Sequence, residues 1–165
     1  MTDAISFAAT HHVRDTCLCL HAQRAARALA RRFDDALRPI GLTNSQFSLL
    51  NALNRPTPAT MGEVARLLGA DRTTLTAALR LLTRDGLTRT EADPVDQRAR
   101  RIALTPAGLA RLAAALPIWT AVHAGLEAEL EADQPAQLRR GLSALAAPGP
   151  REMAPPVCEA EEYPR

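Results

Sequence analysis

The chain has 165 residues, of which 47% are hydrophobic and 3% aromatic, so it can bury the core of one compact domain but offers few rings for stacking on single-stranded nucleic acid. No apolar run approaches the about 20 residues that span a bilayer, there is no secretory signal, and three cysteines form no disulfide framework, so we expect a cytoplasmic protein without a membrane partner. Residues 1–120 hold 16 arginines against 10 acidic residues, whereas residues 121–165 hold 4 against 8, and we expect an anionic partner to bind the basic part.

The first predicted elements are a long helix and a shorter one. Apolar residues recur at three- and four-residue steps over residues 12–38, which predicts one helix ended by Pro39 and Gly41. Thr43 and Gln46 then form a capping box, in which each side chain bonds the backbone at the start of a helix.

Residues 60–84 are predicted to form two short helices joined by about three residues. A capping box of Thr60 and Glu63 begins the first helix, and Asp71 caps the second, which Gly86 ends. The side chains expected to face inward are Val64, Leu67, Leu68, Leu75, Ala78, Leu79 and Leu82. This is the pattern of a helix-turn-helix.

The second of these helices begins with arginine and short hydroxyl side chains. In a helix-turn-helix this part of the second helix enters the major groove, where hydroxyls allow close approach and arginine contacts phosphate or guanine. We therefore predict double-stranded DNA as a partner, contacted by Arg72, Thr73, Thr74, Thr76 and Arg80. The alternative is a solvated surface with ordinary cap chemistry.

Residues 87–104 are predicted to form a β-hairpin with a long tip. The tip holds Arg98, Arg100 and Arg101, and a wing at this position reaches the neighbouring minor groove, whose negative potential attracts arginine. Asp96 could hold the Arg98 side chain by a charge-assisted hydrogen bond. The alternative is an ordinary exposed turn.

The remaining elements flank this unit. Thr105 and Pro106 begin a helix that should run to about residue 132 with a kink at Pro117, followed by a helix over 134–146 and a flexible tail over 148–165. We therefore predict a mainly α fold: a winged helix-turn-helix domain at 41–105 between dimerisation helices at 10–40 and 106–147. A homodimer would place two reading helices about one DNA turn apart and imply a pseudo-palindromic site. Alternatively, the long helices pack only on their own domain.

The chain resembles the MarR family of bacterial winged-helix regulators over about residues 12–146. The resemblance is carried by "GLTNSQFSLLNAL", "MGEVARLLGADRTTLTAALRLLTRDGL" and the wing signature "DPVDQRARRIALTPAG". It implies a homodimeric, ligand-responsive repressor or, less often, an activator. It also implies that Asp96 and Arg98 are the wing pair at the minor groove.

The resemblance further implies that a small-molecule effector binds between the dimerisation helices and the winged helix-turn-helix domain. Ligands of the family include aromatic acids, phenolics and acyl thioesters. Arg24 and Arg27 share a helix face with Arg31 and could meet a carboxylate, and His21 and Trp119 are further candidates. The alternative is that these arginines are solvated or paired with nearby aspartates.

Two other functions stay open. Some members of the family sense organic hydroperoxides through one cysteine near the start of the first helix, where Cys19 lies, but Phe33 and Asn44 stand where those sensors have tyrosines. Within one helix Cys17 and Cys19 would point about 200° apart, so they could not easily form a disulfide or bind one metal, and small buried residues are the alternative. The other function is a helix-turn-helix that contacts only proteins.

We expect neither a metal nor another cofactor, because the four histidines lack the spacing of a zinc site. We also expect no enzyme, because no nucleophile–base set, phosphate loop or carboxylate pair is present.

Overall fold

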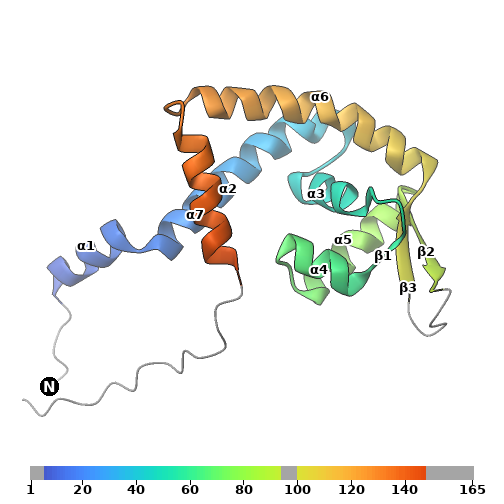
Figure 1. Cartoon of the computed structure of the whole chain (residues 1–165), viewed down its shortest axis with the longest axis horizontal. Coiled ribbons are helices and arrows are strands. Elements are labelled where there is room, and N and C mark those ends of the chain that lie inside the picture. The colour runs from blue at the N-terminus through green and yellow to red at the C-terminus, as the bar shows by residue number, and fades with distance from the viewer. Residues whose placement is uncertain (1–5, 94–99, 148–165) are drawn as a thin grey trace, which may run out of the picture. The chain divides into compact units, whose positions relative to one another are not determined.

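The structure, a computed structural model, describes residues 6–93 and 100–147. The fold is mainly α with a small antiparallel sheet, as the sequence predicts (Figure 1). The elements are α1 (Phe7–Thr16), α2 (Leu18–Leu37), η1 (Arg38–Ile40), α3 (Asn44–Leu53), β1 (Ala59–Thr60), α4 (Met61–Leu68), α5 (Arg72–Arg84), β2 (Thr88–Ala92), β3 (Arg100–Leu104), α6 (Pro106–Ala128) and α7 (Gln134–Ala146). The chain divides into two units, Met1–Leu126 and Glu127–Arg165.

The predicted single helix over residues 12–38 is wrong, because α1 and α2 are separate helices. Cys17 lies between them in extended backbone (φ −71°, ψ 105°), and its N–H still donates to Val13 O at the end of α1. Its sulfur accepts a hydrogen bond from Leu20 N, so Cys17 is the N-cap of α2. Apolar spacing alone missed this boundary, because cysteine is not among the residues that usually signal a cap.

The helix-turn-helix forms as predicted. Both capping boxes are present, at the starts of α3 and α4, and Asp71 caps α5 by accepting from Thr74 N. Gly69 ends α4 with a φ of 59°, in the left-handed region that glycine adopts without strain. One predicted core residue is wrong: Leu67 is 65% exposed, whereas Val64 is fully buried.

The hairpin is also confirmed, and it carries a third strand that the sequence did not indicate. The strand order is β1-β3-β2, with β3 antiparallel to both neighbours. Ala59 pairs with Ile102 and Thr88 with Leu104. A strand of two residues is too short to show a period, so β1 could be found only from its pairing.

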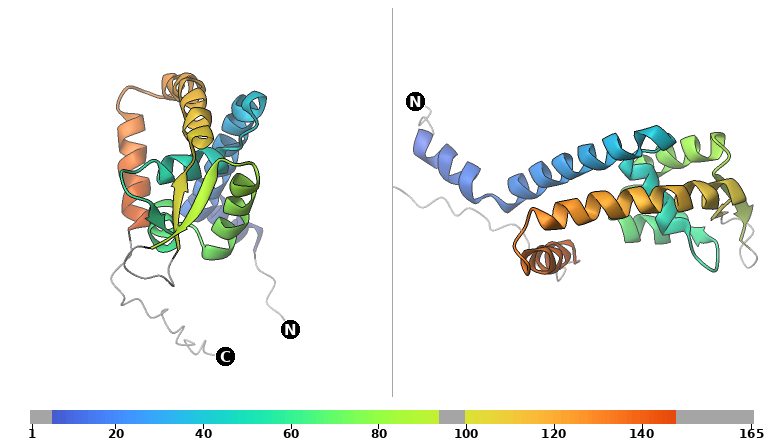
Figure 2. Two further views of the ribbon diagram at one scale, coloured as in Figure 1. Left: turned by 90° about the vertical axis from the view of Figure 1, so that its right-hand side faces the viewer. Right: turned by 90° about the horizontal axis from the view of Figure 1, so that it is seen from above.

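The start of α6 lies very close to the residue that precedes β2. Thr105 caps α6, and a Cβ built on Gly108 would lie 2.0 Å from Leu87 O. Arg111 of α6 donates to Ile40 O in η1 at 2.7 Å. These contacts place α6 beside α3–α5 and the sheet, which gather at one end of the long helices, while α1 extends away from them (Figure 2).

Among the described helices, α6 is long and apolar enough to cross a membrane by length and composition. Its best 18-residue window has a mean hydropathy of 1.3, and 11% of that window is buried. The expectation that no apolar run approaches this length is therefore wrong, because alanines fill the gaps between the leucines. The core helix of a water-soluble protein passes the same test. The helix continues through Pro117.

The second unit holds α7 and the end of α6. Arg139 pairs with Glu127 at 2.5 Å. Leu138, Leu142 and Leu145 are exposed. The predicted tail at 148–165 lies outside the described residues.

Candidate nucleic-acid interface

One face of α5 is packed into the core and the opposite face is open. Leu75, Leu79 and Leu82 are buried, at spacings of three and four residues. The open face forms a shallow groove of about 320 Å³ lined by Arg72, Thr73, Thr76, Ala77 and Arg80. Four of the five predicted contacts on this helix therefore share one surface. The fifth, Thr74, is exposed but does not line the groove.

The three hydroxyl groups at the start of α5 differ in what they already bind. Thr74 Oγ1 donates to Asp71 Oδ2 at 2.6 Å, and Thr76 Oγ1 donates to Arg72 O at 2.6 Å. The hydroxyl of Thr73 has no hydrogen bond to any described residue. Thr73 is thus the one of the three that can both donate to and accept from a ligand without giving up an existing hydrogen bond.

The cap that holds the start of α5 is charged. The side chain and the backbone N–H of Thr74 both donate to Asp71, and they hold the pKa of its carboxyl below the ordinary range. The ionised carboxylate is the better acceptor, and its negative charge suits the N-terminal end of a helix. Asp71 and Thr74 therefore fix the helix end from which Thr73 projects.

The groove carries positive charge that no described carboxylate neutralises. Arg72 and Arg80 are exposed and form no salt bridge with a described residue. Arg84, one turn beyond Arg80, differs because it pairs with Asp85 at 3.0 Å. Two free guanidinium groups on one helix face suit an anionic surface.

The two arginines at the start of β3 have different surroundings. Arg100 is exposed. Arg101 Nε pairs with Asp93 Oδ2 at 2.5 Å, and its Nη1 donates to Pro58 O at 3.0 Å. Arg101 was expected at the hairpin tip, and it instead ties the two strands of the hairpin to the loop before β1. Sequence reasoning missed Asp93, which shows its role only through the pairing of β2 with β3.

The predicted wing pair, Asp96 and Arg98, lies outside the described residues. Strand β2 ends at Ala92 and strand β3 begins at Arg100, and the predicted pair belongs to the segment between them.

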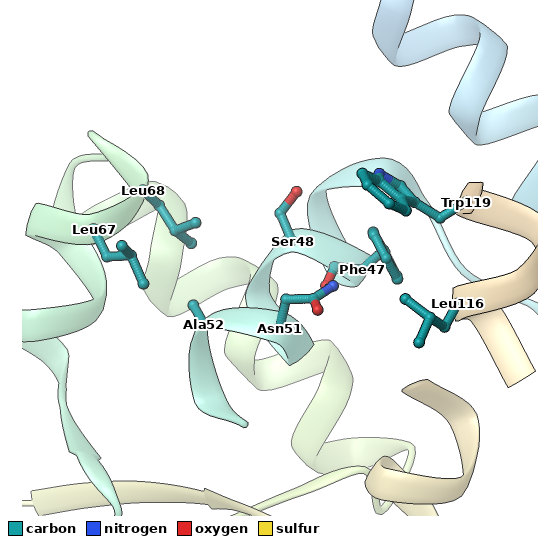
Figure 3. A pocket seen from close by; sticks show the side chains of 8 residues that line it. All are labelled: Phe47, Ser48, Asn51, Ala52, Leu67, Leu68, Leu116 and Trp119. Atoms are coloured by element: carbon teal, nitrogen blue, oxygen red, sulfur yellow. The ribbon is translucent and has the colours of Figure 1, made fainter. Parts of the chain in front are cut away.

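A separate apolar pocket of about 430 Å³ lies where α3, α4 and α6 meet (Figure 3). Its lining is Phe47, Ser48, Asn51, Ala52, Leu67, Leu68, Leu116 and Trp119. The Trp119 ring stacks on Phe47, with centroids 6.4 Å apart and an interplanar angle of 25°. No charged side chain lines this pocket.

Of the four effector candidates, only Trp119 lines the apolar pocket. Arg24 and Arg27 line a different shallow groove along α2, together with Arg31, and Arg27 donates to Gln23. The Nε2 atom of His21 lies 3.2 Å from the carbonyl oxygen of Asp15. The structure therefore does not bring Arg24 and Arg27 into the pocket that Trp119 lines, because they occupy a face of α2 that does not border it.

Cys17 and Cys19 do not fit the alternative interpretation, in which both would be small buried residues. Cys17 is half-buried and Cys19 is exposed, and both are free thiols. Among the described residues there is no group of three or more histidine, cysteine or acidic side chains that could hold a metal ion.

The fold and the exposed α5 define a winged helix-turn-helix protein of the DNA-binding class, and comparison with known proteins agrees. A sequence model of the MarR family matches residues 40–99. The transcriptional regulator MosR of M. tuberculosis, solved in complex with DNA, is 44% identical with a TM-score of 0.71, over 79% of this chain and 93% of MosR. The repressor CouR, a Rhodococcus jostii RHA1 protein solved on a 23-mer DNA duplex, is 29% identical with a TM-score of 0.73, over 81% of this chain and 95% of CouR.

One curated relative is the transcriptional activatory protein BadR of Rhodopseudomonas palustris. It is 34% identical over 88 residues, which are 52% of this chain and half the length of BadR. The chain belongs to the MarR family. It is a transcription regulator, and the relatives are regulators of transcription rather than enzymes.

Proposed function

We propose that the chain is a homodimeric repressor that acts on DNA in the cytoplasm and reads a pseudo-palindromic site through α5. The observation that carries this proposal is the open face of α5, where Arg72 and Arg80 form no salt bridge, and the Thr73 hydroxyl no hydrogen bond, with a described residue. The DNA complexes of MosR and CouR support double-stranded DNA as the partner. Arginines reach phosphates or guanine edges, and Thr73 and Thr76 allow close approach to the bases.

The wing completes the interface with DNA in this proposal. Arg100 is exposed where β3 leaves the tip, and by the family resemblance Arg98, held by Asp96, enters the minor groove. Thr74 keeps a supporting role, because its hydroxyl is bound to the cap carboxylate.

The homodimer is supported by apolar side chains that one chain leaves exposed. They occur on the helices outside the helix-turn-helix: Phe7, Val13, Leu18, Leu29, Leu109, Leu116, Leu138, Leu142 and Leu145. Clustered exposed apolar residues mark interaction surfaces, and a second copy can cover them. Sedimentation at micromolar concentration should give the mass of two chains, and a lone chain at this concentration would contradict the dimer.

The effector in this proposal is a small molecule that binds the apolar pocket and shifts the dimer toward a form whose reading helices do not match the DNA. Trp119 and Phe47 offer a stacked aromatic wall, with Ser48 and Asn51 as the polar groups. The aromatic acids, phenolics or acyl thioesters expected from the family would place their rings here. BadR is an activatory protein, so activation is the alternative to repression.

The test compares two arginines of α5 that carry the same charge. Arg80→Ala should weaken operator binding and flatten the dependence of affinity on salt, by a slope of about 0.9 for each phosphate that the variant no longer binds. Arg84→Ala removes the same charge from a residue already paired with Asp85 and should change both much less. Equal effects in the two variants would show that only the net charge of the protein matters. That result would contradict the proposal that the open face of α5 contacts DNA.

The second candidate, a helix-turn-helix that contacts only proteins, predicts that the chain ignores duplex DNA even at low salt. A mobility-shift titration with random duplex at low salt separates the two functions.

A further inference from the structure

A hollow of about 290 Å³ lies between the segment before β1, the β2–β3 hairpin and the start of α6. Its lining includes Arg55 and Arg89 and the apolar residues Leu53, Ala103, Leu104 and Leu109. None of the described residues that line it carries a carboxylate. We propose that this Arg55–Arg89 hollow is a ligand site, separate from the apolar pocket at Trp119, and that it binds a small carboxylate with an apolar body.

The wall that carries Arg55 is held at both ends. Arg55 N donates to Leu53 O at 2.9 Å, and Asn54 between them (φ −77°, ψ 77°) has the backbone of an inverse γ-turn. At the other end of the segment, Pro58 O accepts from Arg101 Nη1 at 3.0 Å. The segment is therefore fixed before a ligand arrives, which lowers the cost of ordering it on binding.

The two arginines are held in different ways, and both keep free donors. Arg89 Nη1 donates to Leu104 O at 2.8 Å, which fixes this guanidinium at the end of β3, and its Nε lies 3.7 Å from Glu91 Oε2. Arg55 forms no salt bridge or side-chain hydrogen bond with a described residue. Because a guanidinium has five N–H donors, both side chains can donate to the oxygens of one carboxylate.

Glu63 is an acidic residue on which the charge of Arg55 acts, but the two form no salt bridge. Glu63 Oε2 accepts from Thr60 N at 2.8 Å and from Thr60 Oγ1 at 3.0 Å. These hydrogen bonds hold the pKa of the Glu63 carboxyl below its ordinary range, and the charges of Arg55 and Arg101 add to the effect. Glu63 is thus committed to the capping box of α4, and the Arg55 guanidinium is left to a ligand.

An apolar floor distinguishes this hollow from the other grooves that arginines line. Leu53 of α3 and Ala103 and Leu104 of β3 are buried. The grooves at Arg24 and at Arg72, in contrast, each lie along a single helix. Small-molecule sites combine apolar walls with a few polar groups that fix orientation, and their volumes begin at about 300 Å³, so this hollow suits a ligand the size of one ring.

The test is a calorimetric titration of the full-length protein with benzoate, carried to about 10 mM so that weak binding is detected. Benzamide has the same shape without the charge and is the control ligand. We expect benzoate binding to saturate and benzamide to bind at least about tenfold more weakly, because it cannot accept charge-assisted hydrogen bonds from both arginines as a carboxylate does. Benzoate that does not saturate, or that binds no better than benzamide, would overturn the proposal.

The variants place the ligand. Arg55→Ala should weaken benzoate binding by about tenfold and leave the Tm unchanged, because this side chain has no hydrogen bond to a described residue. Arg89→Ala should weaken binding to a similar extent; it also loses the bond to Leu104 O, so Arg55→Ala decides alone if Arg89→Ala does not fold. Arg24→Ala removes the same charge from the groove along α2 and should bind benzoate like the wild type. Wild-type affinity in Arg55→Ala, or an equal loss in Arg24→Ala, would show that the site is wrong.

Trp119, the one tryptophan of the chain, reports whether benzoate enters the apolar pocket instead. Leu109 lines the hollow and Trp119 lines the pocket, and ten residues of α6, about 15 Å along the helix axis, separate them. Benzoate in the Arg55–Arg89 hollow should therefore leave the fluorescence of Trp119 unchanged at saturation. A change in fluorescence that saturates with the calorimetric Kd would place benzoate in the apolar pocket and overturn the proposal. Neither measurement uses DNA, so the result stands whether or not the chain reads a pseudo-palindromic site.

Discussion

Two neighbouring arginines of β3 should respond in opposite ways to the same substitution. Arg100 is exposed and is proposed to contact DNA, whereas Arg101 pairs with Asp93 and donates to Pro58 O. We expect Arg101→Ala to lower the stability of the fold. We expect Arg100→Ala to leave stability unchanged and to weaken DNA binding.

The magnitude for Arg101→Ala follows from the burial of the pair. Removing one partner of a fully buried ion pair costs about 3–5 kcal/mol, because the other charge is left without compensation. Asp93 is 7% exposed but Arg101 is 28% exposed, so water screens part of the interaction and we expect about 2 kcal/mol. For a chain of this size that corresponds to a fall in Tm of roughly 4–8 °C.

The assay has two readouts, thermal unfolding and operator affinity over a range of salt. Arg100→Ala should keep its Tm, and its salt slope should fall by about 0.9 for each phosphate that it no longer binds. An Arg101→Ala protein that unfolds like the wild type, or an Arg100→Ala protein with wild-type affinity and slope, would refute the division of roles. Arg101→Lys is a further control, because lysine keeps the charge but cannot bond both Asp93 and Pro58 with the same fork.

Three other predictions follow from the same structure. Gly108→Ala should destabilise the fold by about 3 kcal/mol in denaturant unfolding, because the new Cβ would lie 2.0 Å from the backbone oxygen of Leu87; wild-type stability would mean that α6 can shift at no cost. Asp71→Asn keeps a cap residue that cannot titrate. Because the pKa of Asp71 is lowered in the folded protein, its carboxylate contributes stability above its ordinary pKa of about 4, and this stability is lost as the pH falls through the lowered value. The stability of the variant should therefore depend less steeply on pH below about 4, and identical acid-unfolding profiles would rule this out. Thr73→Ala should change the preference among operator bases with little effect on Tm. Thr74→Ala should lower the Tm, because it removes a hydrogen bond to the cap carboxylate of Asp71. The reverse pattern would contradict the assignment.

Part of the candidate site could be predicted from the sequence, because it depends on residues close together in the chain. The order of the helices and the hairpin from α3 to α7, both capping boxes, and the Asp71 cap were correct. Four of the five predicted contacts on α5 share one open face, which the period of a helix fixes by itself. The sequence could not show that Thr74 binds the cap carboxylate, because that depends on a side-chain rotamer.

Predictions that needed distant segments to meet fared worse. The effector candidates Arg24 and Trp119 line different hollows of the structure, because the face that a helix presents depends on its packing partners. Leu67 follows the apolar period of α4 and is nevertheless exposed. Arg101 looked like a tip residue until the register of β2 and β3 placed it beside Asp93.

The sequence by itself determined where most helices begin and end and which side of α5 is polar, since caps, glycines and helical periods act within a few residues. Only the tertiary structure decided that β1 joins the sheet, that α6 needs Gly108 to approach Leu87, and that an apolar pocket without charge forms at Trp119. These features join segments far apart in the chain. Their geometry is set by how whole elements pack against one another, and no local pattern encodes it.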